Sequence, residues 1–199
     1  MRSSTVAMAA LAMAPIVGIA AADVVYDEAF DGELSGDPNA PTFIVVGEGN
    51  NTVIAVTDQD GDDRDFFTFN VAEGFELVGV ILDIFDTNTN DPANLGFIGF
   101  SAGDVLGTDP LAPDPTALLG YALVGIGDSG SDIFDVMAQG GGSQGYDGPL
   151  GAGDYTFWLQ ETSPSADDWS VTLVINQVPA PGALALLGMV GLAGRRRRG

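Results

Sequence analysis

The sequence contains no cysteine, no histidine and no lysine. Without cysteine no disulfide can form, and without cysteine or histidine the usual zinc shells, the Cys–His dyad and the Ser-His-Asp triad are excluded. Ser129 lies in a Gly127–Gly130 segment with a protease-like pattern, but no histidine exists to accept its proton, so a glycine turn is favoured. The common nucleophilic enzymes are therefore excluded.

Basic residues are scarce between the two ends of the chain. All 28 acidic residues lie between Asp23 and Asp168, where Arg64 is the one basic residue, so this part has a formal charge of 1 − 28 = −27. Such a field repels nucleic acid and anionic lipid and attracts divalent cations and basic partners. Acidity also keeps a protein soluble in salty water, where ions screen its self-repulsion. We expect no nucleic-acid partner.

The N-terminus has the layout of a secretory leader. Arg2 precedes an apolar stretch, Val6 to Ala21, which ends in the small residues that a signal peptidase requires. We therefore predict a signal peptide over 1–22, cleaved before Asp23. An N-terminal membrane anchor is the alternative.

The C-terminus has an equally distinct order. Four residues with two prolines lead into a charge-free run of 13 residues, Gly182–Gly194, and an arginine cluster follows. The residues before and after the run are Val178, Pro179, Ala180, Pro181 and Arg195, Arg196, Arg197, Arg198. As a helix the run spans about 20 Å, against about 30 Å of bilayer hydrocarbon. This predicts a short transmembrane helix with its arginines on the cytoplasmic side.

This order resembles the PEP-CTERM sorting signal of exosortase-bearing bacteria, with Ala180 where the family usually has Glu. The resemblance implies export, transient anchoring in the bilayer through 182–194, cleavage by an exosortase, and delivery to the cell surface or extracellular matrix. Signal peptidase and exosortase are then the partners during export. An uncleaved tail anchor remains the alternative.

The remaining segment, 23–177, is long enough for one domain with its own core. Short runs of β-branched and aromatic residues, separated by Gly, Asp, Asn or Pro, predict strands. These runs are Asn51–Thr57, Asp65–Val71, Glu76–Asp86, Gly96–Ser101, Gly120–Gly125, Ile133–Ala138, Asp154–Thr162 and Trp169–Ile175. We predict an all-β fold, an antiparallel β-sandwich of jelly-roll type. Alternation places Thr68, Asn70, Thr156 and Gln160 on a wetter face or in a lesser core.

The stretches Asp63–Gly74, Leu150–Gln160 and Trp169–Ile175 resemble the bacterial pre-peptidase C-terminal (PPC) domain. The resemblance covers about Asn50 to Ile175. It implies a jelly-roll-like sandwich that serves as a secreted binding or spacer domain. Such domains usually accompany a peptidase, and this chain contains none.

One acidic loop predicts a metal site. Asp58, Asp60, Asp62, Asp63 and Asp65 surround Gly61, and Ca²⁺ takes six to eight oxygen ligands from flexible loops of this kind. The loop does not fit the EF-hand spacing. A second stretch, Asp86–Asp91, offers a weaker version of the pattern. Both stretches also fit turns in which Asp and Asn bond their own backbone.

Three functions remain open. The first is a non-enzymatic surface or matrix protein, in contact with extracellular polysaccharide. The second is a calcium-dependent module that binds polysaccharide or protein, on which Trp158 and Trp169 could form a platform, although their alternating strands favour core packing. The third is a secreted hydrolase with two carboxylates, because 28 acids offer many pairs.

Overall fold

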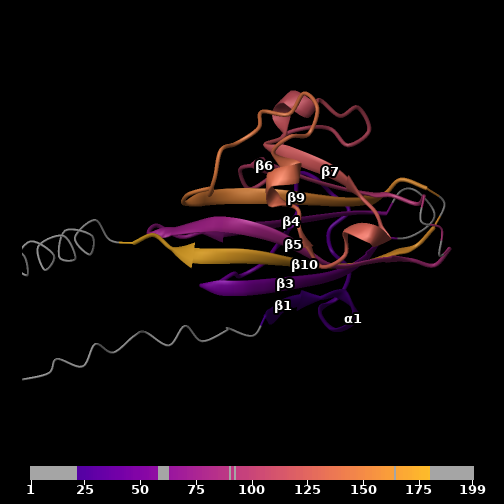
Figure 1. Ribbon diagram of the computed structural model, residues 1–199, viewed down its shortest axis with the longest axis horizontal. Coiled ribbons are helices and arrows are strands. Elements are labelled where there is room, and N and C mark those ends of the chain that lie inside the picture. Colours follow the sequence, from indigo (N-terminus) through magenta and orange to yellow (C-terminus); the bar gives the residue numbers. More distant parts are fainter. Residues whose placement is uncertain (1–21, 58–62, 90, 92, 164, 180–199) are drawn as a thin grey trace, which may run out of the picture.

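The computed structural model describes residues 22–57, 63–89, 91, 93–163 and 165–179. Two sheets are stacked face to face, and the loops join them at both ends (Figure 1). This arrangement buries the apolar side of each sheet against the other. The predicted leader helix and tail helix lie outside the described residues, as do Asp58, Asp60 and Asp62.

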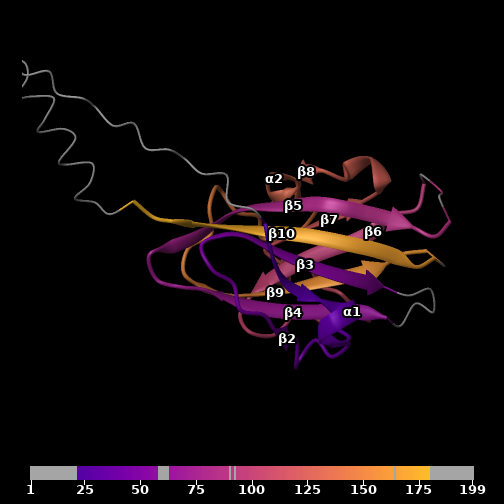
Figure 2. The same ribbon diagram turned by 90° about the horizontal axis from the view of Figure 1, so that it is seen from below.

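Each sheet has five strands. The first sheet has the order β1-β3-β10-β5-β8, of which Figure 1 labels β1 beside β3 and Figure 2 labels β3, β10, β5 and β8; the second has the order β2-β4-β9-β6-β7. The first consists of β1 (Asp23–Asp27), β3 (Gly49–Thr57), β10 (Asp167–Gln177), β5 (Phe75–Thr87) and β8 (Ser131–Asp132). The second consists of β2 (Thr42–Phe43), β4 (Arg64–Val71), β9 (Gly153–Glu161), β6 (Gly96–Ala102) and β7 (Gly120–Val124).

The helices are short. They are α1 (Glu28–Asp31), α2 (Phe134–Met137) and the 3-10 turns η1 (Pro115–Ala117) and η2 (Ile126–Asp128). Within the described part of the chain, no helix has the length and apolar character that a bilayer crossing requires.

The sheets are mixed, which corrects the expectation of a purely antiparallel sandwich. β1 runs parallel to β3, and β2 runs parallel to β4. Parallel neighbours need a crossover connection, and the segment between β1 and β3 provides one, because it contains α1 and then β2 of the other sheet. The other strand pairs are antiparallel.

The antiparallel pairs are nested along the chain. β6 pairs with β7, β5 with β8, β4 with β9 and β3 with β10. Each pair joins an earlier strand to a later one, and the pairs lie in order around the connection between β6 and β7. The chain therefore crosses repeatedly between the two sheets.

The main core lies between the sheets and contains most of the large apolar side chains. Phe157 of β9 stacks on Phe67 of β4 at 5.3 Å and on Phe100 of β6 at 4.8 Å between ring centroids. Trp169 of β10 packs edge-on against Phe85 of β5 at 4.7 Å. Aromatic pairs at these separations contribute beyond the area they bury.

A second, smaller cluster lies on the outer face of the second sheet. It contains Phe66, Leu106, Leu118 and Trp158. Alternation in β4 and β9 places Thr68 and Thr156 on this same face, where both are buried. Of the four residues predicted for a wetter face or a lesser core, Thr68 and Thr156 are buried, Gln160 is half-buried and Asn70 is exposed.

Seven of the eight predicted strand segments coincide with strands, and Ile133–Ala138 does not. There the chain forms α2, because Ile133, Phe134 and Met137 are buried at helical spacing while Val136 is exposed. The Asp132 carboxylate accepts a hydrogen bond from the Phe134 N–H at 3.0 Å and stabilises the first turn. The prediction of a strand here was wrong, because six residues are too few to separate the two periods.

Both ends of the described chain lie at one end of the sandwich. Asn51 of β3 is paired with Asp23 of β1 on one side and with Leu173 of β10 on the other. The Val178 N–H donates to the Gly74 carbonyl at 2.8 Å and holds the chain after β10 against the β4–β5 turn. Asp23 and Val178 therefore lie at the same end of the sandwich.

Candidate metal centre

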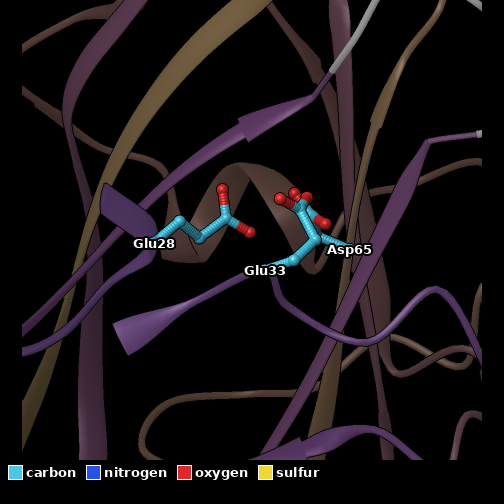
Figure 3. Close-up of side chains that lie close together, drawn as sticks. All are labelled: Glu28, Glu33 and Asp65. Carbon is cyan, nitrogen blue, oxygen red and sulfur yellow. The ribbon is translucent and has the colours of Figure 1, made fainter. Parts of the chain in front are cut away.

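Three carboxylates from separate parts of the chain converge near the opposite end of the sandwich (Figure 3). They belong to Glu28 of α1, Glu33 of the following loop and Asp65 of β4, and one oxygen from each lies within 4.8 Å of the others. Glu28 is half-buried, Glu33 is exposed and Asp65 is buried. Three acids this close repel one another unless a cation or protons separate them.

The backbone holds Glu28 in a defined position. Its Oε1 accepts a hydrogen bond from the Leu34 N–H at 2.9 Å, and its Oε2 accepts one from the Val56 N–H of β3 at 2.6 Å. Glu28 lies at the first position of α1, which begins after Asp27, whose carboxylate accepts from the Ala29 N–H at 3.0 Å. The carboxylate of Glu28 is therefore ordered before any ligand binds.

A glycine brings Glu33 beside Glu28. Gly32 ends α1 with φ 96°, a left-handed value that a residue with a side chain rarely adopts. The chain reverses there, and Leu34 returns to donate its N–H to Glu28. The turn thus places two acidic side chains on one side of the loop.

Asp65 is the most unusual residue of the cluster. It lies on β4 opposite Leu159, and alternation directs it to the same face as Phe67 and Phe69 of the main core. Its side chain is 0% exposed, and neither carboxylate oxygen has a hydrogen-bond partner. Buried polar atoms are nearly always partnered, so a buried carboxylate whose two oxygens have no donor makes this position a candidate site for a cation or a proton.

The electrostatics follow from this burial. Burial, followed by the charges of Glu28, Asp63 and Glu33, raises the pKa of Asp65 to about 9. Burial also raises the pKa of Glu28, although the hydrogen bonds from Leu34 and Val56 oppose the shift. Without a cation Asp65 therefore carries a proton at neutral pH, and a bound cation would replace that proton.

The structure brings part of the predicted acidic loop to this centre. Asp65 is in the cluster, and Asp63 adds to the negative potential at Glu28 and Asp65. Asp58, Asp60 and Asp62 lie outside the described residues. The Arg64 Nε donates to the Gln160 Oε1 at 3.0 Å.

Sequence reasoning missed Glu28 and Glu33. They are more than 30 positions away from Asp65, and a search for closely spaced acids cannot find a site that long-range strand pairing assembles. One local signal involves Glu28, because Asp27 followed by Glu28 is a pattern typical of the start of a helix. That signal indicates a cap and gives no indication of a ligand.

A second polar cluster lies beside the other predicted acidic stretch. The Nδ2 of Asn94 lies within hydrogen-bonding distance of three acceptors, Thr87 Oγ1 at 3.0 Å, Ser165 Oγ at 2.8 Å and Asp167 Oδ1 at 2.9 Å, to which its two N–H groups donate. Thr87 belongs to the Asp86–Asp91 stretch at the end of β5. The cluster thus ties the β5–β6 loop to the β9–β10 hairpin.

Two buried carboxyl groups interact next to this cluster. Asp167 and Glu161 are 0% and 3% exposed, and neither the Asp167 Oδ2 nor the Glu161 Oε2 has a hydrogen-bond donor. Burial and the contact with Glu161 raise the pKa of Asp167 to about 7. Asp167 therefore keeps its proton to a higher pH than an exposed aspartate does. Glycosidase carboxylates stand about 5 to 9 Å apart on either side of a substrate, and this pair has neither that separation nor that access.

The two tryptophans have different surroundings. Trp169 is 1% exposed in the main core, and its Nε1 donates to Thr57 Oγ1 at 3.0 Å. Trp158 is 3% exposed in the outer cluster, and its Nε1 has no acceptor. Trp169 is therefore both packed and hydrogen-bonded in the core, whereas Trp158 is packed but its Nε1–H lacks an acceptor.

No known protein family, curated protein or solved structure matches this chain. Among the described residues, the cluster of Glu28, Glu33 and Asp65 is the best-defined candidate site.

Proposed function

We propose that this chain is an exported, non-enzymatic surface or matrix protein whose sandwich domain binds calcium through Glu28, Glu33 and Asp65. The observation that carries the calcium proposal is the buried Asp65 carboxylate, whose two oxygens have no donor and which faces two further carboxylates. The leader pattern at 1–22 and the tail pattern at 178–199 support export.

Calcium fits this centre better than softer metals do. The donors are carboxylate oxygens, which are ligands of hard cations, and three carboxylates can supply up to six oxygens if each binds through both. Ca²⁺ tolerates irregular geometry and waters in its shell, whereas Mg²⁺ requires a near-octahedral one. Extracellular calcium modules bind with dissociation constants of about 10⁻⁴–10⁻³ M, the range that an exported protein requires.

The position of the centre suits a tethered domain. Val56, which donates to Glu28, lies five positions along β3 from Asn51, which is paired with the first residue of β1 and with Leu173 of β10. At about 3.3 Å per residue this distance is roughly 17 Å. While the tail holds the domain at a bilayer, the metal centre therefore points away from that surface.

The fold is consistent with the proposed jelly roll. The nested pairing of β3–β10, β4–β9, β5–β8 and β6–β7 is the pattern of a jelly roll, with β1 and β2 added at the edges. This supports the PPC-like assignment, in which the domain is a secreted binding or spacer module.

Calorimetric titration of the full-length chain with CaCl₂ at pH 7 tests the metal centre. We expect binding with release of about one proton per ion, because Asp65 must ionise. Buffers with different ionisation enthalpies reveal this release. Glu33→Gln should weaken binding, and Asp104→Asn, a matched charge change on an exposed turn, should not. Calcium binding of equal strength in Glu33→Gln, or no heat in the unmodified chain, would contradict the proposal.

Sorting is tested in the native host. Mass spectrometry of the mature surface protein should find no peptide beyond Pro181. Replacement of Arg195–Arg198 by glutamine should cause mislocalisation, because those charges hold the tail's end in the cytoplasm. Recovery of an intact arginine terminus on the finished protein would show that the tail is a permanent anchor.

A further inference from the structure

A pocket of about 330 Å³ lies on the outer face of the second sheet. Three aromatic residues and three prolines of the β6–β7 loop form most of its wall: Phe97, Tyr121, Trp158, Pro110, Pro113 and Pro115. The volume lies within the range of small-ligand pockets, about 300–1,000 Å³. No residue of the metal centre lines it.

Strand register builds the aromatic wall. Gly99 of β6 is paired with Tyr121 of β7 on one side and Trp158 of β9 on the other. Phe97 lies above this row, with its ring centroid 5.7 Å from that of Tyr121 and 4.4 Å from that of Trp158. A Cβ on Gly99 would lie 2.8 Å from the Phe97 ring, so the bare backbone makes room for the three rings.

The pocket wall also contains a hydrogen-bond donor without a partner. The Trp158 side chain is 3% exposed, and its Nε1–H has no acceptor. Gln160 lies two positions further along the same face of β9, and its Oε1 accepts a hydrogen bond from the Arg64 Nε. Buried donors without partners are rare, and here one coincides with an aromatic pocket.

We propose that this pocket binds a neutral sugar ring of an uncharged polysaccharide. A sugar ring has apolar C–H faces that pack on aromatic rings and hydroxyl oxygens that accept from an indole or amide N–H. A purely apolar ligand would leave the Trp158 donor without a partner. The wall has no Asp, Glu, Lys or Arg, and the chain's net charge of −22 repels acidic polymers.

The two tryptophans provide the experiment with an internal reference. In the ¹⁵N-labelled full-length chain, neutral hexasaccharides of glucose, mannose and N-acetylglucosamine are titrated to millimolar concentration. The indole resonance of Trp158 should shift with at least one probe. The indole resonance of Trp169 should not move, because its N–H is bonded to Thr57 in the core. The shift should persist in EDTA and in Glu33→Gln, since the proposed site shares no residue with the metal centre.

Matched variants test the two parts of the site. Trp158→Phe keeps an aromatic ring and removes the donor, so the affinity measured by calorimetry should fall about tenfold. Phe97→Leu should lower it at least as much, whereas Phe43→Leu, an exposed aromatic on edge strand β2, should leave it unchanged.

Two results would overturn the proposal. One is an unmoved Trp158 resonance with every sugar probe, including the case in which a proline-rich peptide shifts it instead. The other is unchanged sugar affinity in both Trp158→Phe and Phe97→Leu.

Discussion

Replacement of Asp65 by asparagine tests the central feature of the metal centre, a buried acid without a partner. Asparagine has nearly the same shape and no ionisable group. In calcium-free buffer at pH 7 we expect Asp65→Asn to be more stable than the unmodified protein. The physical reason is that the folded protein must take up a proton at Asp65, which the unfolded chain releases.

The magnitude follows from the pKa values. The pKa of Asp65 is about 9 in the folded state against an ordinary 3.8, so the folded state is penalised across the whole interval from 3.8 to pH 7. At about 1.4 kcal/mol per pH unit, that penalty is roughly 4 kcal/mol. Unpartnered amide atoms of the asparagine cost about 1–3 kcal/mol. The net gain is about 2 kcal/mol, or roughly 4–8 °C in Tm for a domain of this size.

The sign of the pH dependence provides the assay. Because the folded pKa is raised, the stabilisation of the unmodified protein by this proton is complete below pH 4 and is lost as the pH rises towards 9. Thermal melts in EDTA at pH 4, 5.5 and 7 should therefore show the two proteins separating with increasing pH. Asp104→Asn, which removes the same charge from an exposed turn, should show no such separation.

Calcium should reverse the order. At 100 times its dissociation constant an ion stabilises the folded state by about 2.7 kcal/mol, and only the unmodified protein should gain this. If Asp65→Asn melts below the unmodified protein by the same margin at pH 4 and pH 7 in EDTA, Asp65 is not a buried acid with a raised pKa, and the reasoning fails.

Three further predictions concern other parts of the fold. Gly96→Ala should lower the free energy of unfolding, measured in urea, by about 1–3 kcal/mol, because its Cβ would lie 2.4 Å from the Trp169 ring. Equal urea midpoints of the two proteins would show that the neighbouring side chains can move aside. Glu28→Gln should cost about 1–3 kcal/mol in the same assay, since one of two backbone N–H groups loses its acceptor, and it should weaken calcium binding. Asp167→Asn should reduce the loss of stability between pH 5 and pH 7, where the folded protein keeps the proton of Asp167, whose pKa is raised to about 7, and the unfolded chain does not; identical pH profiles would refute this.

Alternation and turn residues were enough to place most strands. In β4 and β9 every second side chain is large and apolar, and both the main core and the lesser outer core follow from that pattern. The segment at 133–138 was misread as a strand, because its apolar spacing fits either period until packing decides. Nothing in the local sequence of the edge strands β1 and β2 indicates that they run parallel to β3 and β4. Their direction depends on where the chain crosses between the sheets.

The proposed metal centre also depends partly on local sequence and partly on tertiary structure. Composition and spacing pointed to carboxylate oxygen donors in the acidic loop that ends at Asp65, and Asp65 is the residue of that prediction which belongs to the cluster. Only the tertiary structure brought Glu28 and Glu33 to Asp65 and buried that carboxylate without a donor. Likewise, the sequence determined that both tryptophans lie on strands, but strand register and the loop prolines decided that Trp169 is core and Trp158 lines a pocket. Contacts between distant residues depend on how the sheets pair, and no short stretch of sequence contains that information.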